Sequence, residues 1–166
     1  MLLENNNLNL NSPKQIDASK IFGVSKKIMV PYFSQKSDLV PEVDDGYVFD
    51  DATTTSILMG FKYNKKVLIQ GLHGTGKSSH IEQISARLNW PCVRINLDGH
   101  ISRFDLLGKD GIVLEGDKQV TTFKEGLLPW AIKNPVALVF DEYDAGRPDV
   151  MFVIQRVLEA EGKLTL

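Results

Sequence analysis

The residues with the most specific chemistry form a glycine-rich run, Gly71-Leu72-His73-Gly74-Thr75-Gly76-Lys77-Ser78. The run matches the pattern G-x-x-x-x-G-K-[ST], in which glycines let the backbone fold closely round phosphates and successive N–H groups form an anion nest. It follows the apolar stretch Val67-Leu68-Ile69 and precedes a helical pattern, which is the context that this motif requires. The sequence therefore predicts a nucleoside triphosphate site, the alternative being an ordinary glycine-rich turn.

The residues expected to hold the nucleotide belong to this phosphate loop (residues 71–78) and to the residue after it. In the motif, the lysine reaches the β- and γ-phosphates and the final hydroxyl ligates Mg²⁺, roles that fall to Lys77 and Ser78. The backbone N–H of His73 takes part whether or not its side chain does. The expected set for ATP is Gly71, His73, Gly74, Thr75, Gly76, Lys77, Ser78 and Ser79.

A second run ends in two carboxylates. Val136-Ala137-Leu138-Val139-Phe140 is strongly strand-like and is followed by Asp141 and Glu142. Carboxylates at the C-terminal end of a buried strand lie where α/β sheets bind ligands. After a phosphate loop, this run indicates a Walker-B element: Asp141 would hold Mg²⁺ with Ser78, and Glu142 would orient or deprotonate the attacking water. The predicted catalytic residues are thus Lys77, Asp141 and Glu142, the alternative being an exposed acidic strand end.

Two histidines lie outside these runs. His80 follows the phosphate loop and His100 lies further along the chain. Isolated histidines of this kind are more often solvated or hydrogen-bonded structural residues than ligands. Because no second histidine stands at ligand spacing, the sequence predicts no metal site beyond Mg²⁺.

Four other side chains each have two interpretations. Arg147 and Arg156 follow the Asp-Glu pair, and each would either reach a neighbouring subunit or stay solvated or ion-paired within the chain. Tyr47 and Phe49 precede the first expected strand of the core and would contact an adenine ring or, as we favour, pack in the core.

Periodicity and turn residues divide the chain into alternating helices and strands. Asp17 is a plausible N-cap for a short helix at 18–22 that Gly23 ends. In the helix after the loop, Glu82, Gln83 and Arg87 are expected to face away from the core. The other expected elements are a helix at 50–61, a strand at 67–70 buried on both faces, a helix at 78–88, a strand at 92–97, a short helix at 101–107, a hairpin of 112–114 and 119–123, a short helix at 126–133, strands at 136–140 and from 162, and a helix at 148–160.

The chain is expected to have two parts. Residues 1–45 would form a flexible tail and N-terminal extension, because residues 1–15 are rich in asparagine and Pro31 and Pro41 describe an extended connector without core residues. Residues 46–166 would form a partial ATPase core.

Composition narrows the class of protein. Hydrophobic residues at 43% and charged residues at 24% of 166 are typical of a globular domain. A net charge of -2 gives no overall electrostatic reason to bind nucleic acid or an acidic membrane. The single cysteine, Cys92, excludes a disulfide within the chain and is expected to be a core thiol. The absence of a signal peptide and of a long apolar run favours a cytoplasmic protein.

With these pieces placed, the chain resembles the AAA+ ATPases of the MoxR/chelatase branch, and within them the ATPase subunits of aerobic cobaltochelatases. The resemblance covers roughly residues 21 to 166, and this branch carries a β-hairpin that interrupts the second helix, as 112–123 would here. Its most specific stretches are 71–78 with His80-Ile81-Glu82-Gln83, Arg87 to Arg94, His100-Ile101-Ser102-Arg103, Leu107-Gly108-Lys109-Asp110 and Asp141 to Val150.

The resemblance implies a P-loop NTPase (AAA+) fold, a three-layer α/β/α core with a parallel sheet and the hairpin insertion. It implies a hexameric ring that couples ATP hydrolysis to insertion of Co²⁺ into hydrogenobyrinic acid a,c-diamide in aerobic cobalamin biosynthesis. CobT-like and CobN-like subunits would be its partners, with no nucleic acid and no membrane involved.

One departure from the family affects turnover. The family continues past Gly162-Lys163-Leu164 to a polar sensor, an arginine finger and a helical lid, and we expect the core to be incomplete at the C-terminus, as in a truncated copy or a fragment. ATP binding is therefore the firmer expectation and hydrolysis the weaker. Two alternatives remain: a MoxR-like chaperone ATPase for another metalloprotein, and a nucleotide-binding module without turnover.

Overall fold

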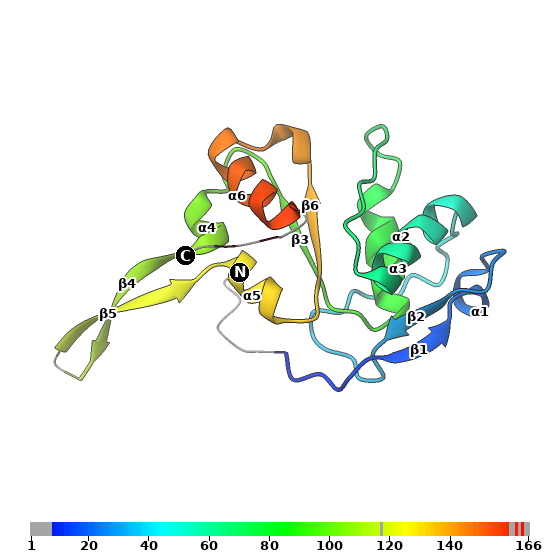
Figure 1. Cartoon of the computed structure of the whole chain (residues 1–166), viewed down its shortest axis with the longest axis horizontal. Coiled ribbons are helices and arrows are strands. Elements are labelled where there is room, and N and C mark those ends of the chain that lie inside the picture. The colour runs from blue at the N-terminus through cyan, green and yellow to red at the C-terminus, as the bar shows by residue number, and fades with distance from the viewer. Residues whose placement is uncertain (1–7, 117, 160–161, 163, 165–166) are drawn as a thin grey trace. The chain divides into compact units, whose positions relative to one another are not determined.

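A computed structural model describes residues 8–116, 118–159, 162 and 164 (Figure 1). The chain forms two compact units. The loop unit comprises residues 9–93 and 136–139 and contains the phosphate loop. The acidic unit comprises residues 1–8, 94–135 and 140–166 and contains Asp141 and Glu142.

The loop unit begins with a small antiparallel sheet. Strand β1 (Lys14–Asp17) pairs with β2 (Met29–Tyr32), and the short helix α1 (Ser19–Phe22) lies between them in the chain. The side chain of Asp17 accepts hydrogen bonds from the backbone N–H and the hydroxyl of Ser19, and Gly23 ends the helix at φ 67°. The expected short helix and its glycine stop are confirmed, whereas the N-cap is Ala18 and not the expected Asp17.

Helix α2 (Asp51–Tyr63) follows an extended segment. Asp50 caps it by accepting a hydrogen bond from the backbone N–H of Thr53, as a carboxylate at an N-cap does. Gly60 lies within the helix rather than at its end, where a Cβ would stand 2.5 Å from the side chain of Val67. The missing side chain lets the returning chain pass close to α2.

Helix α3 (Lys77–Arg87) starts directly after the phosphate loop and packs with α2 on one apolar core. Ile84 and Leu88 from this part of the chain and Ile57 and Leu58 from α2 are buried. The other buried members come from the N-terminal segment: Ala18, Phe22, Val24, Ile28 and Val30. The helix that carries the loop is thus anchored on side chains from the first thirty residues.

This shared core corrects one expectation. Residues 24–45 were expected to be a connector without core residues, which is wrong, because Val30, Phe33 and Val40 are buried. The prolines do not prevent burial of their neighbours. Pro31 lies within β2 in a two-stranded sheet, where both strands are edge strands and proline is tolerated. The division of the chain at residue 45 stays a prediction, against which the shared core argues.

The prediction of a strand at 67–70 is also wrong. These residues form no strand, and Leu68 is 82% exposed. A strand requires a neighbouring strand to satisfy its backbone groups, and the described residues supply none beside 67–70. The apolar pattern predicted burial correctly only for Ile69, which packs against the core.

Strands β3 (Cys92–Asn96) and β6 (Ala137–Asp141) pair with each other and run in parallel. In the loop unit the backbone N–H of Ala137 donates to the carbonyl of Pro91 at 2.8 Å. In the acidic unit the N–H of Leu97 donates to the carbonyl of Asp141 at 3.0 Å. Both strands were expected; Cys92, expected in the core, is half-buried.

Among its described residues, the acidic unit contains three α-helices and a long hairpin. Helices α4 (Arg103–Leu107) and α5 (Leu127–Lys133) flank the hairpin of β4 (Gly108–Glu115) and β5 (Lys118–Glu125). After β6 come a 3-10 turn at Tyr143–Ala145 and helix α6 (Pro148–Leu158). The buried hydrophobic side chains of this unit include Ile95, Leu97, Leu106, Leu128, Trp130, Val150 and Ile154. All the expected helices and the hairpin are confirmed.

The hairpin extends beyond α4 and α5 (Figure 1). Its start requires a glycine: Gly108 has φ 115°, and a Cβ there would stand 2.5 Å from the carbonyl oxygen of Lys124. Ile112 and Leu114 are exposed on it.

Within the described ranges no helix has the length and apolar character needed to cross a membrane. Of the strand expected from 162, residues 163, 165 and 166 lie outside the described residues.

Candidate nucleotide site

The phosphate loop is open to solvent. Residues 71–75 are exposed, and Gly74 has φ 76° with no atom within 4 Å of the position a Cβ would take. Gly76 has φ 78° and is the N-cap residue of α3. These left-handed conformations suit glycine, and the free space beside Gly74 leaves the backbone accessible to a ligand. The loop therefore leaves an open space beside its backbone, which a side chain at Gly74 would partly occupy.

Lys77 lies across this loop. Its Nζ donates to the carbonyl oxygens of Gly71 at 2.9 Å and Leu72 at 2.7 Å. The hydroxyl of Thr75 donates to the same carbonyl of Leu72 at 2.9 Å. A cation held only by neutral carbonyls, close to solvent, can transfer its donors to a phosphate, for which charge-assisted bonds are stronger.

The start of α3 adds a second anion-binding feature. The helix has 11 residues, and its N-terminal N–H groups point toward the loop that precedes them. Ser78 is half-buried, whereas Ser79 and His73 are exposed. The chain thus brings all the expected nucleotide-binding residues together in one loop and one helix start, and this donor set fits a polyphosphate.

His80, one turn into α3, is buried and fully hydrogen-bonded. Its Nδ1 lies 3.0 Å from the hydroxyl of Tyr47, and its Nε2 lies 2.8 Å from the hydroxyl of Thr54 on α2. Burial lowers the pKa of His80, opposed by the nearby charge of Asp50. Burial also raises the pKa of Tyr47, so the pair is neutral near neutral pH. The expectation of a satisfied structural histidine is confirmed.

The same face of α3 holds the segment 42–49. The side chain of Gln83 accepts from the N–H of Asp44 at 2.9 Å and donates to the carbonyl of Glu42 at 3.0 Å. Arg87 donates to the carbonyl of Asp44 at 2.7 Å and lies over the ring of Phe49. The expectation that Gln83 and Arg87 face away is therefore wrong. Their spacing from His80, at i+3 and i+7, was the sequence signal for a common face.

In the acidic unit, Asp141 ends β6 with both carboxylate oxygens engaged. Arg94 of β3 donates from Nε to Oδ2 at 2.7 Å and makes a second contact to the same oxygen from Nη2. The backbone N–H of Glu142 donates to Oδ1 at 3.1 Å. Arg94 was not expected at the site, although its place on the strand that pairs with β6 gives it this reach.

Glu142 has a left-handed backbone conformation, with φ 51° and ψ 45°. It is exposed and precedes the 3-10 turn. Left-handed conformations are unusual for a residue of this type and often occur at functional sites. A carboxylate at a strand end, turned out of the strand by its own backbone, can accept a proton from a water molecule.

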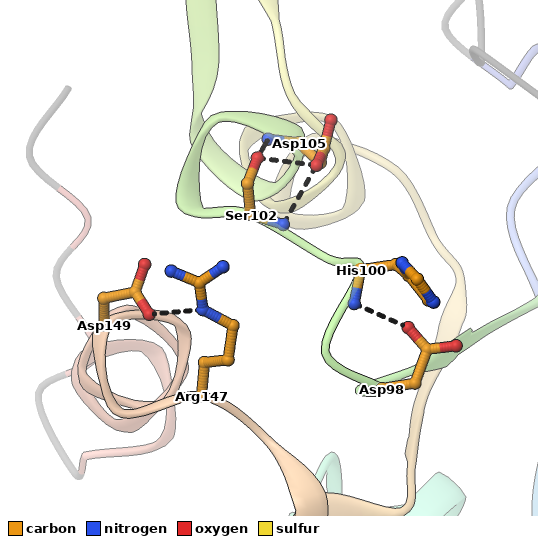
Figure 2. A network of polar contacts seen from close by, with 6 residues as sticks. All are labelled: Asp98, His100, Ser102, Asp105, Arg147 and Asp149. Carbon is orange, nitrogen blue, oxygen red and sulfur yellow. Dashed lines mark hydrogen bonds and ion pairs between the residues drawn. The ribbon is translucent and has the colours of Figure 1, made fainter.

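The weaker candidates lie elsewhere in the acidic unit (Figure 2). Arg147 forms an intrachain ion pair with Asp149, Nε to Oδ1 at 3.2 Å, one of the two outcomes expected for it. The backbone N–H of His100 donates to the side chain of Asp98. Arg156 is exposed and lines a cavity of about 410 Å³. Within the part of the chain that the structure describes, no cluster of His, Cys, Asp or Glu could hold a metal by itself.

The chain is similar to known proteins along most of its length. The aerobic cobaltochelatase subunit CobS of Sinorhizobium sp is 60% identical over 151 residues, which are 91% of this chain and 46% of that protein. Uncharacterized proteins of Staphylococcus saprophyticus subsp. saprophyticus and Staphylococcus haemolyticus are 31% and 30% identical over 122 residues, 73% of this chain and 44% of each relative. The chain therefore spans just under half the length of these relatives.

A family model described as an AAA domain of the dynein-related subfamily matches residues 66–165, from just before the phosphate loop to beyond α6. Together with the parallel pair β3 and β6, this match confirms the predicted α/β P-loop NTPase fold. The chain belongs to the AAA domain family, in its dynein-related subfamily.

Proposed function

We propose that the chain is the ATP-binding and ATP-hydrolysing part of a cobaltochelatase motor subunit, which drives Co²⁺ insertion into hydrogenobyrinic acid a,c-diamide in aerobic cobalamin biosynthesis. The observation that carries the ATP site is the exposed phosphate loop, with its open glycines and with the ammonium of Lys77 donating to the neutral carbonyls of Gly71 and Leu72. The observation that carries the chelatase role is the 60% identity to a protein named as a cobaltochelatase subunit.

Each site residue has a role that its surroundings support. Lys77 exchanges the carbonyls of Gly71 and Leu72 for the β- and γ-phosphates. The N–H groups from Gly74 to Ser79 would bind the phosphate oxygens, and Ser78 and Asp141 are the residues that would hold Mg²⁺. A bound Mg²⁺ supplies charge neutralisation at the phosphates. Glu142 takes the proton of the attacking water.

The wider assembly follows from the same relationship. AAA domains use nucleotide and often assemble into oligomers, and we propose a hexameric ring in which neighbouring subunits complete each ATP site. CobT-like and CobN-like subunits would be the partners and the compartment would be cytoplasmic. The similarity to the Sinorhizobium protein supports this proposal, because the name of that protein describes it as one subunit of a cobaltochelatase.

The first experiment is a titration of the 166-residue chain with ATP and Mg²⁺ by isothermal titration calorimetry. Lys77→Ala removes the charged donor and should weaken binding by about 100-fold or more, since a charge-assisted contact to each of two phosphates is lost. Lys65→Ala, on an exposed lysine outside the loop, is the matched control and should bind as the wild type does. Undiminished ATP affinity in Lys77→Ala would overturn the loop assignment.

The second experiment measures turnover and metal insertion with CobT-like and CobN-like subunits present. The motor role would be supported if cobalt incorporation requires ATP hydrolysis and if Glu142→Gln abolishes both. Tight ATP binding with background turnover, even with these partners, would instead identify a nucleotide-binding module. Recovery of an unrelated metalloprotein as the functional partner would favour the chaperone alternative.

A further inference from the structure

One face of α3 fixes a segment of chain beside the phosphate loop. His80, Gln83 and Arg87 lie along this face, and the last two hold the backbone of residues 42–44 through three hydrogen bonds. The helix that begins at the loop therefore also determines where residues 42–49 lie. Any change in these contacts moves that segment relative to the loop.

Within this segment, Tyr47 is the residue that reaches the loop. Its hydroxyl lies 3.9 Å from the position that a Cβ on Gly76 would take, and its N–H donates to the carbonyl of Asp44. Gly76 is the residue whose left-handed conformation starts α3. The Tyr47 hydroxyl thus stands over the turn from which the loop N–H groups and Lys77 project.

The other contact of this hydroxyl is to His80. The Nδ1 of His80 lies 3.0 Å from it, while the Nε2 on the far side of the ring lies 2.8 Å from the hydroxyl of Thr54. Phe49 packs edge-on against both rings, at centroid distances of 5.0 Å from Tyr47 and 5.4 Å from His80. His80 is 7% exposed, so these two hydroxyls take the place of water around the imidazole.

We propose that His80 is a positioning residue for the phosphate loop, which acts by holding Tyr47 against Gly76. The two ring nitrogens have different tasks: Nδ1 sets the position of Tyr47 and thereby the affinity for polyphosphate, while Nε2 ties α3 to α2 and serves stability. This inference deepens the proposed ATP site and rests on it. Because the contact lies at the phosphate end, it affects ATP and GTP alike.

Two amide substitutions separate the tasks of the two nitrogens. In His80→Asn the amide group is bonded at the same distance from the backbone as Nδ1 and can contact the Tyr47 hydroxyl. In His80→Gln the amide is one carbon further out, near the place of Nε2, and can contact Thr54 instead. Both substitutions remove the ring and lose its packing, so each serves as the control for the other.

The experiment measures the dissociation constants of ATP and GTP with Mg²⁺ by calorimetry, and the thermal midpoint of each protein. Tyr47→Phe and His80→Gln should each weaken ATP and GTP by the same factor, about five- to tenfold, as expected for loss of one hydrogen bond. His80→Asn should restore affinity to within about twofold of the wild type, although its thermal midpoint should fall further than that of His80→Gln, because His80→Asn loses the contact to Thr54.

Thr54→Val provides the reciprocal test, because it removes the partner of Nε2 and keeps Tyr47. It should lower the thermal midpoint and change nucleotide affinity by less than Tyr47→Phe does. Equal weakening by His80→Asn and His80→Gln, or wild-type affinity in Tyr47→Phe, overturns the positioning role. If wild-type protein binds ATP and Lys77→Ala does not, such a result refutes only this inference and leaves the ATP site in place.

Discussion

The two candidate charged groups of this chain are held in opposite ways. In the loop unit, the ammonium of Lys77 contacts neutral carbonyl oxygens, and the helix behind it is anchored by a buried apolar core and hydrogen bonds to backbone. In the acidic unit, the carboxylate of Asp141 contacts the guanidinium of Arg94, a group of opposite full charge. Neutral acceptors are readily exchanged for phosphate, whereas a cation that approaches Asp141 meets a charge already in place.

This difference indicates which forces each half depends on. The loop unit should respond to changes in packing and little to salt, while the site in the acidic unit should respond to charge and ionic strength. The two tryptophans allow the halves to be followed separately. Trp90 packs against Phe33 and Phe61 in the loop unit, and Trp130 is buried in the acidic unit. Single-tryptophan proteins made with Trp130→Phe and Trp90→Phe therefore report each unit by fluorescence.

The largest expected effect is on the packing of α3. Ile84→Ala empties a fully buried position in the core beneath the loop and should lower the free energy of unfolding by about 2–5 kcal/mol. Urea unfolding followed by Trp90 measures it. The matched control is Ile132→Ala on α5, where the side chain is 58% exposed and little should change. Equal losses in the two variants would contradict the anchoring of the loop on a buried core.

A smaller effect is expected at the start of α4. Ser102 and Asp105 form a capping box, in which each side chain bonds the backbone N–H of the other (Figure 2). Ser102→Ala should destabilise the acidic unit by about 1 kcal/mol, measured by urea unfolding with Trp130 as the probe. Ser34→Ala, on an exposed serine of the loop unit, should have no measurable effect. A loss seen by Trp90 alone would break the assignment of this cap to the acidic unit.

Removal of the cation beside Asp141 tests whether charge controls the site in the acidic unit. Arg94→Gln removes the guanidinium that contacts the Asp141 carboxylate, so the Mg²⁺ concentration at half-maximal ATP binding should fall about threefold at low salt. Added KCl should reduce this difference, because the Asp141 side chain is still 18% exposed and screening applies. Arg147→Gln, which breaks a similar pair with Asp149, is the control. An unchanged Mg²⁺ requirement would argue against Asp141 as a ligand.

The smallest effect is expected in acid. Hydrogen bonds from Ser19, Thr53 and Ser25 lower the pKa values of Asp17, Asp50 and Asp51 in the loop unit. A carboxylate with a lowered folded-state pKa stabilises the fold above its ordinary pKa, and that stabilisation is lost as pH falls through the lowered value. The loop unit should therefore lose stability below about pH 4.

The acidic unit offers a comparison at low pH, since hydrogen bonds from Ser102 lower the pKa of Asp105. Because the loop unit has three carboxylates of this kind, the Trp90 signal should fall steeply as the pH drops, and the Trp130 signal provides the comparison. Thermal midpoints measured by both probes between about pH 5 and pH 3 would decide it. A steeper fall at Trp130 would show that other groups govern acid unfolding.

The helices were predictable because their signals are local. Asp50 capping α2, Gly23 ending α1 and Pro148 opening α6 each act within one turn, so the sequence alone places them. The phosphate loop was predictable for the same reason, because its spacing is contiguous. The irregular conformation of residues 67–70 was not predictable, because a strand forms only beside a neighbouring strand, and no local pattern shows whether one is present.

The side-chain partners of the site were the least predictable. Arg87 and Gln83 have charge and polarity typical of a solvated face, but they bond a segment some forty residues earlier in the chain. Arg94 lies on an alternating strand, and only the pairing of β3 with β6 brings it to Asp141. Contacts between distant segments follow from topology, which composition and spacing do not determine.

The left-handed backbone of Glu142 has a consequence for the choice of residue at this position. Three described residues other than glycine have positive φ, and the other two are Asn64 and Asn89, a type that tolerates this conformation. A glutamate there costs roughly 1 kcal/mol relative to a residue that adopts it freely. Local stability alone would favour glycine or asparagine after Asp141. The sequence instead carries an acid where the backbone disfavours one, as expected where the carboxylate itself is needed.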